Sequence, residues 1–226
     1  MANGAQTELD AIAFDERGLV PCVAQDWRTG EVLTLAYMNR EALELTLSSG
    51  DVHFFSRSRN ELWRKGATSG NVQRLRSLRY DCDADAVLAL VEPVGPACHT
   101  GERTCFYRTL GAPAIGPHEA LPVLARVLAA RHRELPDGSY SAKLLRQGPD
   151  AIGAKVEEEA EETARAGREE SDERLRAEAA DLLYHLGVML EARGLEFADA
   201  LEELTRRMEG GESSIPAGSS EKAGNT

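Results

Sequence analysis

The sequence Gly111-Ala-Pro-Ala-Ile-Gly-Pro117 divides a chain of 226 residues into two halves of different composition. Its two glycines and two prolines are typical of a linker, because these residues interrupt helices and strands. All four cysteines, both tryptophans and nine of the twelve aromatic residues precede position 114. A chain of this length suits one large domain or two of about 100 to 120 residues. We therefore predict a first domain at residues 1–113 and a second at 114–209.

Towards the N-terminus, the first half contains short β-prone runs separated by Gly, Asp, Asn or Pro. Such runs predict strands at residues 19–24, 32–37, 52–56, 72–80 and 86–93. Residues 39–48 instead have the pattern of one amphipathic helix, with Asn39 as its N-cap and Gly50 just past its end. Together these elements predict an α+β domain with a mainly antiparallel sheet.

Towards the C-terminus, the second half is rich in Ala, Leu, Glu and Arg, with apolar residues three and four apart. This spacing predicts helices at residues 119–132, 149–168, 172–193 and 198–208. Gly167 and Gly194 lie where helices are expected to end. We predict an all-α helical bundle, which can bury its apolar faces by pairing with another chain. Residues 210–226 have the composition of a disordered tail.

The charge balance excludes some partners. The chain has 26 basic and 38 acidic residues, a net charge of −12, which argues against non-specific binding to nucleic acid or anionic membranes. Its longest aliphatic run, residues 86–91, is too short to span a bilayer, and the N-terminus has no signal-peptide pattern. We expect a cytoplasmic protein with reduced cysteines, available for catalysis or metal binding.

The densest group of metal-ligating residues is Asp81-Cys82-Asp83-Ala84-Asp85, followed by Cys98 and Cys105. In an extended segment the three aspartates would share one face and form an oxygen site for Mg²⁺ or Ca²⁺, with Cys82 on the other face. Cys82 could then join Cys98 and Cys105 in a three-thiolate zinc site with one position open. Ordinary buried thiols and a solvated acidic turn are the alternative. Cys22 lies in an apolar run and is better explained as a buried, inert thiol.

Residues 56–71, SRSRNELWRKGATSGN, contain four cations, four hydroxyls and two glycines. A loop of this composition can surround a phosphate with charged donors and backbone N–H groups, although a solvated basic loop is the alternative. In order along the chain, this segment, then DCDAD, then CHTGERTCF resemble phosphoribosyl-AMP cyclohydrolase. The resemblance extends from about residue 18 to residue 107 and keeps the cysteine spacings of 16 and 7 residues.

This resemblance implies hydrolytic opening of the adenine ring of phosphoribosyl-AMP between N1 and C6. It implies zinc on the three cysteines, which activates a water molecule, and Mg²⁺ on the three aspartates. His99 becomes a candidate for moving the proton between that water and the ring nitrogen. The family resemblance also implies a homodimer in which Cys82 is donated across the subunit interface. The implied substrate-binding residues are Arg57, Arg59, Trp63, Arg64, Lys65, Thr68, Ser69 and Asn71.

Acidic residues at helical spacing mark the second half. Glu158, Glu159 and Glu162 can project together from one predicted helix, and Glu178, Asp181 and His185 form a stripe on the next. Carboxylates of two facing helices can coordinate Mg²⁺. A solvated acidic face is the alternative, but the residues around Glu178 and Asp181 are largely apolar, and an unpaired carboxylate is costly there.

This second pattern resembles phosphoribosyl-ATP pyrophosphohydrolase, an all-α enzyme of the MazG-like group, over about residues 121–204. The resemblance implies attack by water on the triphosphate with release of pyrophosphate. It implies Mg²⁺ on Glu159, Glu162, Glu178 and Asp181, with Glu158 as a further candidate for ligand or base. Lys143 and Lys155 are candidates for contacts with the phosphates.

Because one resemblance implies a product that is the substrate of the other, we predict a bifunctional hydrolase for two consecutive steps of histidine biosynthesis. A different zinc-dependent purine hydrolase is an alternative, but the deaminase pattern H-x-E…P-C-x-x-C is absent from the sequence. A protein with structural zinc and a helical dimerisation bundle is another alternative. A chain with only one active domain is the third.

Overall fold

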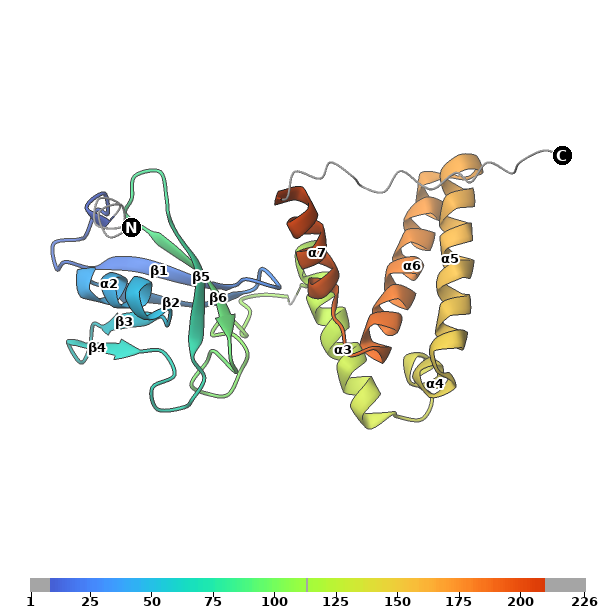
Figure 1. Cartoon of the computed structure of the whole chain (residues 1–226), viewed down its shortest axis with the longest axis horizontal. Coiled ribbons are helices and arrows are strands. Elements are labelled where there is room, and N and C mark those ends of the chain that lie inside the picture. Colours follow the sequence, from blue (N-terminus) through green and yellow to red (C-terminus); the bar gives the residue numbers. More distant parts are fainter. Residues whose placement is uncertain (1–8, 113, 210–226) are drawn as a thin grey trace. The chain divides into compact units, whose positions relative to one another are not determined.

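The computed structural model describes residues 9–112 and 114–209, which form two separate units with the boundary between Glu119 and Ala120 (Figure 1). The boundary follows the Gly- and Pro-rich segment, whose end forms the short 3₁₀ turn η1 (Pro117–Glu119). The predicted disordered tail at 210–226 lies outside the described residues. Among the described residues, no helix is both long and apolar enough to cross a membrane.

The first unit is built around a four-stranded sheet in the order β2-β1-β6-β5. The outer pairs, β1 with β2 and β5 with β6, are antiparallel, whereas the central pair, β1 with β6, is parallel. The predicted α+β fold with a mainly antiparallel sheet is therefore confirmed. The sheet strands are β1 (Val20–Asp26), β2 (Val32–Met38), β5 (Gln73–Tyr80) and β6 (Val87–Pro93).

A helix and a hairpin complete this unit. Helix α2 (Arg40–Ser49) begins as predicted, because the Asn39 side chain accepts a hydrogen bond from the Ala42 amide. It ends at Gly50, whose φ of 74° is the left-handed conformation that glycine adopts without strain. Strands β3 (His53–Ser56) and β4 (Glu61–Arg64) form a separate antiparallel hairpin. Treating residues 56–71 as a single loop was wrong, since β4 lies within it; four residues are too few to show an alternating pattern.

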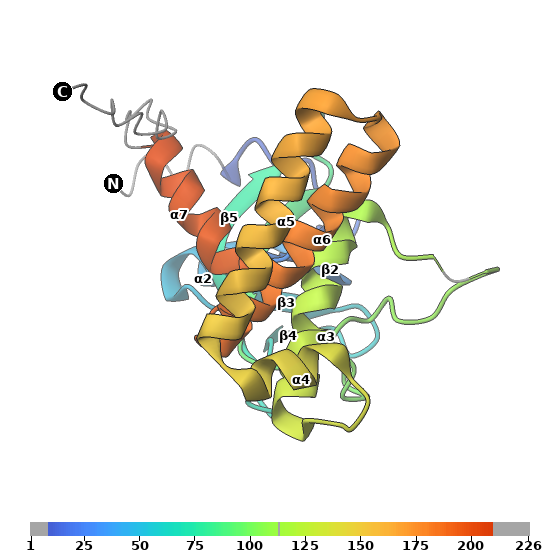
Figure 2. The same ribbon diagram turned by 90° about the vertical axis from the view of Figure 1, so that its right-hand side faces the viewer.

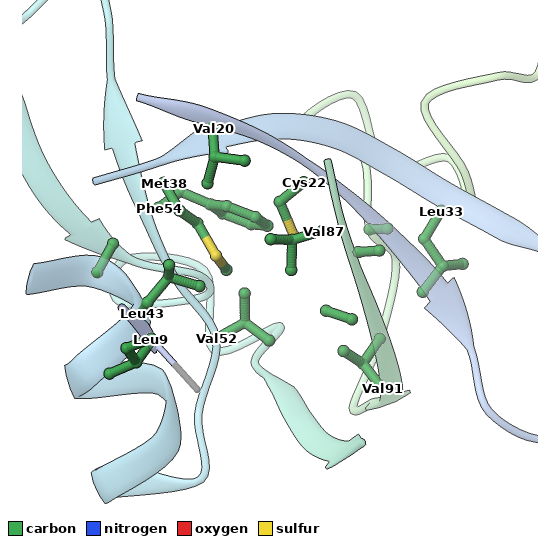
Figure 3. Packing of buried hydrophobic residues seen from close by; sticks show 14 residues of the cluster. Leu9, Val20, Cys22, Leu33, Met38, Leu43, Val52, Phe54, Val87 and Val91 are labelled. Atoms are coloured by element: carbon green, nitrogen blue, oxygen red, sulfur yellow. The ribbon is translucent and has the colours of Figure 1, made fainter. Parts of the chain in front are cut away.

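The core of the first unit lies on one face of β1. Alternate residues of this strand, Val20, Cys22 and Ala24, are fully buried and pack with residues of β6 and α2 (Figure 3). Figure 3 places Cys22 among Val20, Phe54 and Val87. Burial raises the pKa of the Cys22 thiol to about 12, so it stays neutral. The predicted burial of Cys22 is confirmed.

The second unit is entirely helical. Helices α5 and α6 pack side by side along their lengths, and α3 packs against α6 (Figures 1 and 2). Buried apolar residues of four helix segments, Leu128, Leu144, Ile152 and Val188, form its core. The helices are α3 (Ala120–Glu134), α4 (Tyr140–Gln147), α5 (Pro149–Glu169), α6 (Asp172–Ala192) and α7 (Phe197–Glu209).

Two expectations about these helices were wrong. Helix α4 was not predicted, because its eight residues are too few for a clear period, although Ser139 caps it by accepting a hydrogen bond from the Ala142 amide. Gly167 does not end a helix, because the period of α5 continues past it to Glu169. The turn into α6 is instead set by Ser171, which caps that helix through the Arg174 amide. Gly194, with a φ of 70°, does follow the end of α6 as expected.

Candidate active sites

The three aspartates of the DCDAD segment meet in a turn. The expectation of an extended segment was wrong: residues 82–85 follow the end of β5 as a turn, and Ala84 has a φ of 60°. The turn is closed by the Ala86 amide, which donates to the Asp81 carboxylate at 3.1 Å. Even so, carboxylate oxygens of Asp81, Asp83 and Asp85 all lie within 4.8 Å of one another, as a shared cation would require.

The electrostatics of this turn favour a bound cation. All three aspartates are exposed. The negative charges of Asp83 and Asp81 raise the pKa of the Asp85 carboxyl above its ordinary value. A hard divalent cation would relieve this repulsion, and an all-oxygen donor set is suited to Mg²⁺.

Two of the three predicted zinc ligands are brought together. Cys98 and Cys105 lie near the two ends of a tight loop in which the Cys98 amide donates to the Glu102 carbonyl at 3.0 Å. The loop is attached to the sheet by the Cys105 amide, which donates to the Leu33 carbonyl of β2 at 2.8 Å. The two thiols interact with each other. A hydrogen bond from Thr100 lowers the pKa of Cys98, whereas burial raises that of Cys105.

An ion-pair network holds this loop in place. The Arg103 guanidinium contacts Asp26 through Nη2 and Glu31 through Nε, each at 2.7 Å. Both carboxylates are buried or nearly so, at 4% and 11% exposure, so these contacts are shielded from water. The Arg103 carbonyl also accepts from the Ala97 amide at 3.0 Å. Arg103 therefore ties the thiol-bearing loop to the turn between β1 and β2. Sequence reasoning did not single it out.

The third predicted ligand, Cys82, lies apart from the other two. It is exposed in the acidic turn, with its Sγ 3.9 Å from an Asp83 oxygen. Among the residues that the structure describes, neither of the two groups with metal-binding spacing contains a cysteine. A single chain therefore offers two of the three sulfurs at one place. His99 is exposed beside the pair, with Nδ1 3.9 Å from the Cys98 sulfur.

The predicted substrate-binding residues of the first unit lie on the β3–β4 hairpin and the loop after it. Lys65 is buried beside the two thiols; burial lowers its pKa, while Cys105 and Cys98 act in the opposite direction. Trp63 packs on Phe54, with ring centroids 5.3 Å apart. Thr68 and Ser69 are exposed, and Asn71 is half-buried.

The hairpin arginines already have partners. Arg57 lies 3.8 Å above the Tyr37 ring. Arg59 pairs with Glu61 at 2.9 Å, and Arg64 pairs with Asp51 at 3.1 Å. Because all three arginines are exposed, they can exchange these partners for a phosphate without a large desolvation cost.

The loop after β4 depends on glycine. Gly66 has a φ of 85°, and a Cβ there would lie 2.4 Å from the Val72 nitrogen. The loop closes through the Gly70 amide, which donates to the Gly66 carbonyl at 2.9 Å. The exposed backbone of this turn, together with Ser69, forms a suitable lining for an anion.

The acidic site of the second unit forms within one chain. Glu159 of α5 and Glu178 and Asp181 of α6 place carboxylate oxygens within 4.8 Å of one another. Glu159 and Glu178 are buried, whereas Asp181 is exposed. Burial, reinforced by Glu162 and Glu159, raises the pKa of Glu178, and an ion pair with Arg174 opposes this. Buried carboxylates that repel each other are the donor set expected of a divalent-cation site.

The remaining predicted residues surround this group. Glu162 is half-buried next to Glu178 and contacts Arg165 at 3.4 Å. The Lys155 ammonium contacts the Glu158 carboxylate at 2.6 Å and the Glu159 carboxylate at 3.5 Å. Glu158 therefore points to Lys155 at the edge of the acidic group. Lys143 is exposed on α4.

Two further side chains belong to this site. His185 is buried, with Nδ1 3.6 Å from the Glu159 carboxylate, and its Nε2 lies 3.1 Å from the Tyr140 hydroxyl. The sequence placed His185 on the acidic stripe of α6 without giving it a role. Tyr140 lies in a segment that shares the resemblance to phosphoribosyl-ATP pyrophosphohydrolase, but it was given no role, and the helix that carries it was not predicted.

Comparison with known proteins identifies two hydrolase domains. Residues 34–107 match the family of phosphoribosyl-AMP cyclohydrolase, and residues 121–208 match that of phosphoribosyl-ATP pyrophosphohydrolase. The histidine biosynthesis bifunctional protein HisIE of Bacillus subtilis is 48% identical over 201 residues, covering 88% of this chain and 96% of that protein. The HisIE protein of Thermus thermophilus is 52% identical over 203 residues, covering 88% and 94%. The chain therefore belongs to the family of bifunctional histidine-biosynthesis hydrolases.

Proposed function

We propose that each unit of the chain carries out one of two consecutive hydrolyses. The helical unit converts phosphoribosyl-ATP to phosphoribosyl-AMP and pyrophosphate, and the α/β unit opens the adenine ring of phosphoribosyl-AMP between N1 and C6. The observation that carries this proposal is that each family-matched unit has its own cluster of metal-ligating side chains. The substrates are accordingly small phosphorylated nucleotides.

In the helical unit, we assign Mg²⁺ binding to Glu159, Glu162, Glu178 and Asp181. Bound there, Mg²⁺ would offset the charge of the triphosphate and activate or position water. Asp181 is the exposed member of the set and faces the solvent from which the substrate arrives. Lys155 can leave Glu158 to contact a phosphate, which would free Glu158 to accept a proton from water.

In the α/β unit, we assign zinc binding to Cys98 and Cys105 together with Cys82 of a second copy of the chain. Zinc held by three thiolates would lower the pKa of its water molecule. A homodimer is supported by the position of Cys82, which lies apart from the other two sulfurs within one chain. Thiolate ligands also require reduced cysteines, which supports a cytoplasmic location.

The remaining side chains bind the substrate and move protons. His99 would transfer a proton to the ring nitrogen that leaves C6, and its exposed position beside Cys98 supports this role. Asp81, Asp83 and Asp85 would hold Mg²⁺ against the phosphate groups. The hairpin and its loop, with Arg57, Arg59, Arg64 and the Gly66–Asn71 turn, would supply donors to the same phosphates.

Two single substitutions in the full chain test this division of labour. With Zn²⁺ and Mg²⁺ supplied, Cys98→Ser is expected to release pyrophosphate from phosphoribosyl-ATP and accumulate phosphoribosyl-AMP. Glu178→Gln is expected to release no pyrophosphate, yet to open the ring when phosphoribosyl-AMP is supplied. A wild-type chain that performs only one reaction, or one substitution that abolishes both, would contradict the proposal.

A further inference from the structure

The His185 ring lies where three helices meet. It projects from α6 and is 5% exposed. Its Nε2 lies 3.1 Å from the Tyr140 hydroxyl of α4, and its Nδ1 lies 2.9 Å from the Asp181 carbonyl of α6. The same Nδ1 is 3.6 Å from Oε1 of Glu159 on α5. The ring also lies nearly perpendicular to that of Tyr184, with centroids 5.3 Å apart and an interplanar angle of 89°.

In a neutral ring, these contacts favour one of the two positions for the proton. Nδ1 faces two oxygens, the Asp181 carbonyl, which can only accept, and a carboxylate oxygen of Glu159. A bare nitrogen lone pair there would repel both, so Nδ1 carries the hydrogen and donates it to the Asp181 carbonyl. Nε2 is then the acceptor, and its partner, the Tyr140 hydroxyl, is a group able to donate. For a neutral ring, the contacts therefore select the uncommon Nδ1–H form.

The same arrangement places the positive end of an N–H dipole beside a buried carboxylate. At 3.6 Å the contact with Glu159 is longer than a hydrogen bond, so the effect is electrostatic. Glu159 is buried close to Glu178 and Asp181, where each further negative charge is unfavourable. The Lys155 ammonium also contacts the Glu159 carboxylate, at 3.5 Å. The Nδ1–H dipole directs Oε1 while leaving the carboxylate able to bind a cation.

We propose that Tyr140 and His185 are positioning residues for Glu159: the Tyr140 hydroxyl holds His185 in its Nδ1–H form, and that N–H orients the Glu159 carboxylate for the divalent cation. This inference rests on the proposed function of the helical unit, in which Glu159 is a metal ligand. Side chains that orient metal ligands without binding the metal typically contribute 10- to 100-fold to metal affinity or activity. Neither residue is proposed to contact the reacting phosphorus.

The proton position can be measured directly. NMR chemical shifts of the ring nitrogens and carbon-bound hydrogens report which nitrogen of a histidine is protonated. They are measured on the ¹⁵N-labelled, metal-free full chain at mildly alkaline pH. The signal that disappears in His185→Asn identifies residue 185 among the five histidines. We expect protonated Nδ1 and unprotonated Nε2 in the wild type, and a mixture of the two neutral forms in Tyr140→Phe. A wild-type ring that is protonated on Nε2, alone or together with Nδ1, overturns the inference.

A pair of histidine substitutions tests the consequence for the cation. The amide of Asn can occupy the place of Nδ1, whereas the amide of Gln reaches the place of Nε2. We therefore expect His185→Asn to keep Mn²⁺ affinity close to that of the wild type, and His185→Gln to weaken it by about 10-fold or more. Tyr140→Phe, which removes one hydroxyl, should show a smaller loss. Free Mn²⁺ is measured by its electron paramagnetic resonance signal.

The other unit provides the control in the same molecule. Ring opening of phosphoribosyl-AMP should be unchanged in all three variants, and circular dichroism should show an unchanged helix content. Equal losses of Mn²⁺ affinity in the Asn and Gln variants overturn the inference. If the wild type neither binds Mn²⁺ at Glu159 nor releases pyrophosphate, the proposed function fails, and this outcome is distinct from the result of the proton measurement.

Discussion

The two candidate metal sites differ in how much of each lies within one chain. In the helical unit, Glu159, Glu178 and Asp181 converge because two neighbouring helices present residues at helical spacing. In the α/β unit, Cys98 and Cys105 meet across a tight loop, while Cys82 lies elsewhere in an exposed turn. The three carboxylates of the acidic group thus meet within one chain. The three-thiolate site that we propose would instead need the Cys82 sulfur of a second copy.

The two sites differ in what holds their side chains in place. A helix fixes the relative positions of side chains three and four residues apart before any tertiary contact forms. A loop has no such rule, so the thiols depend on anchors, namely the Arg103 ion pairs and the hydrogen bond from Cys105 to β2. We expect the thiol site to be sensitive to assembly and to distant anchors, and the acidic site to be sensitive to packing between its helices.

The largest expected effect is recovery of ring opening when two inactive chains are mixed. Cys82→Ser and Cys98→Ser are each expected to lose ring opening. In a mixed dimer, one of its two sites would receive an intact Cys82 from one chain and intact Cys98 and Cys105 from the other. Random reassociation should therefore restore roughly a quarter of the wild-type activity, as expected for a two-fold dimer. The measurement is ring opening of phosphoribosyl-AMP after joint unfolding and refolding.

Two matched pairs complete this experiment. Cys98→Ser mixed with Cys105→Ser should recover no ring opening, because both cysteines come from the same side of each site. Glu159→Gln mixed with Glu178→Gln should recover no pyrophosphate release, because each acidic site belongs to one chain. If mixing the Cys82 and Cys98 variants restores no ring opening, the proposal of a zinc site shared between two chains is wrong. Recovery in both cysteine pairs would contradict it equally.

A smaller effect is expected from the anchor of the thiol loop. Arg103→Lys keeps the charge but loses the forked contact with Asp26 and Glu31, because an ammonium group cannot reach both carboxylates with the same geometry. We expect zinc affinity to fall by about 10- to 100-fold, as for other supporting contacts of metal sites. Zinc transfer to a chromophoric chelator measures this, with pyrophosphate release as the unaffected activity.

Arg76→Lys is the matched control for Arg103→Lys. Arg76 makes a single exposed ion pair with Glu92 at 2.6 Å, and exposed pairs contribute little. It should retain zinc as the wild type does. If both variants retain zinc equally, the position of the thiol-bearing loop does not depend on Arg103. The thiol site would then differ less from the acidic site in its dependence on distant contacts.

Many helices and strands of this molecule were predicted from the sequence. The elements that were missed are short, whereas the long periodic ones were found. Long periodic segments such as α5 and α6 were predicted, as was the helix capped by Asn39. The short elements β4 and α4 were missed, because four and eight residues carry too little periodicity. Failing to predict α4 also meant failing to predict Tyr140 as part of the acidic site.

The candidate site residues show where sequence spacing is informative. Helical spacing predicted which acidic residues share a face on each helix, but Glu159 meets Glu178 and Asp181 only because α5 packs against α6. The three aspartates did gather, although by a turn rather than by the expected strand alternation. Arg103 could not be singled out, because its partners Asp26 and Glu31 are more than seventy residues away in sequence. Long-range contacts of this kind leave no local pattern.

Packing between helices allows a third test, in the stability of the second unit. Gly187 lies against Phe197 and Leu128, and an added Cβ would lie 2.8 Å from one and 3.1 Å from the other. Gly187→Ala is therefore expected to destabilise the helical unit by about 1–3 kcal/mol, the usual cost of overpacking. On heating, pyrophosphate release should be lost at a lower temperature than in the wild type, while ring opening should be lost at the same temperature.

Gly167→Ala, in the same helical unit, is expected to have the opposite effect on stability. Gly167 is exposed within α5, and a Cβ there meets only Leu175 at an ordinary 3.7 Å. Replacing an exposed helical glycine by alanine should stabilise the unit by about 0.5–1 kcal/mol. If the two substitutions shift the thermal midpoint of pyrophosphate release in the same direction, close packing at Gly187 does not limit the stability of this unit.

The smallest expected effect concerns the acidic turn of the first unit and depends on pH. Asp83 and Asp81 raise the pKa of Asp85 in the folded chain, so its ionised form is less favourable there than in the unfolded chain. This repulsion reduces stability as the pH rises through the carboxyl range and disappears as Asp85 becomes protonated. Without divalent cations, Asp85→Asn should therefore slightly raise the unfolding temperature of the first unit near neutral pH. The difference should fade towards about pH 4.

Added Mg²⁺ should reverse this order, because the cation offsets the repulsion only where all three carboxylates remain. The wild type is expected to gain more thermal stability from Mg²⁺ than Asp85→Asn does, as measured by scanning fluorimetry with and without the ion. Asp10→Asn, which loses an exposed contact with Arg40, should respond to Mg²⁺ like the wild type. Equal responses in the wild type and Asp85→Asn would mean that the turn binds no cation on its own. The aspartates would then resemble the thiols, as a site that a single chain leaves incomplete.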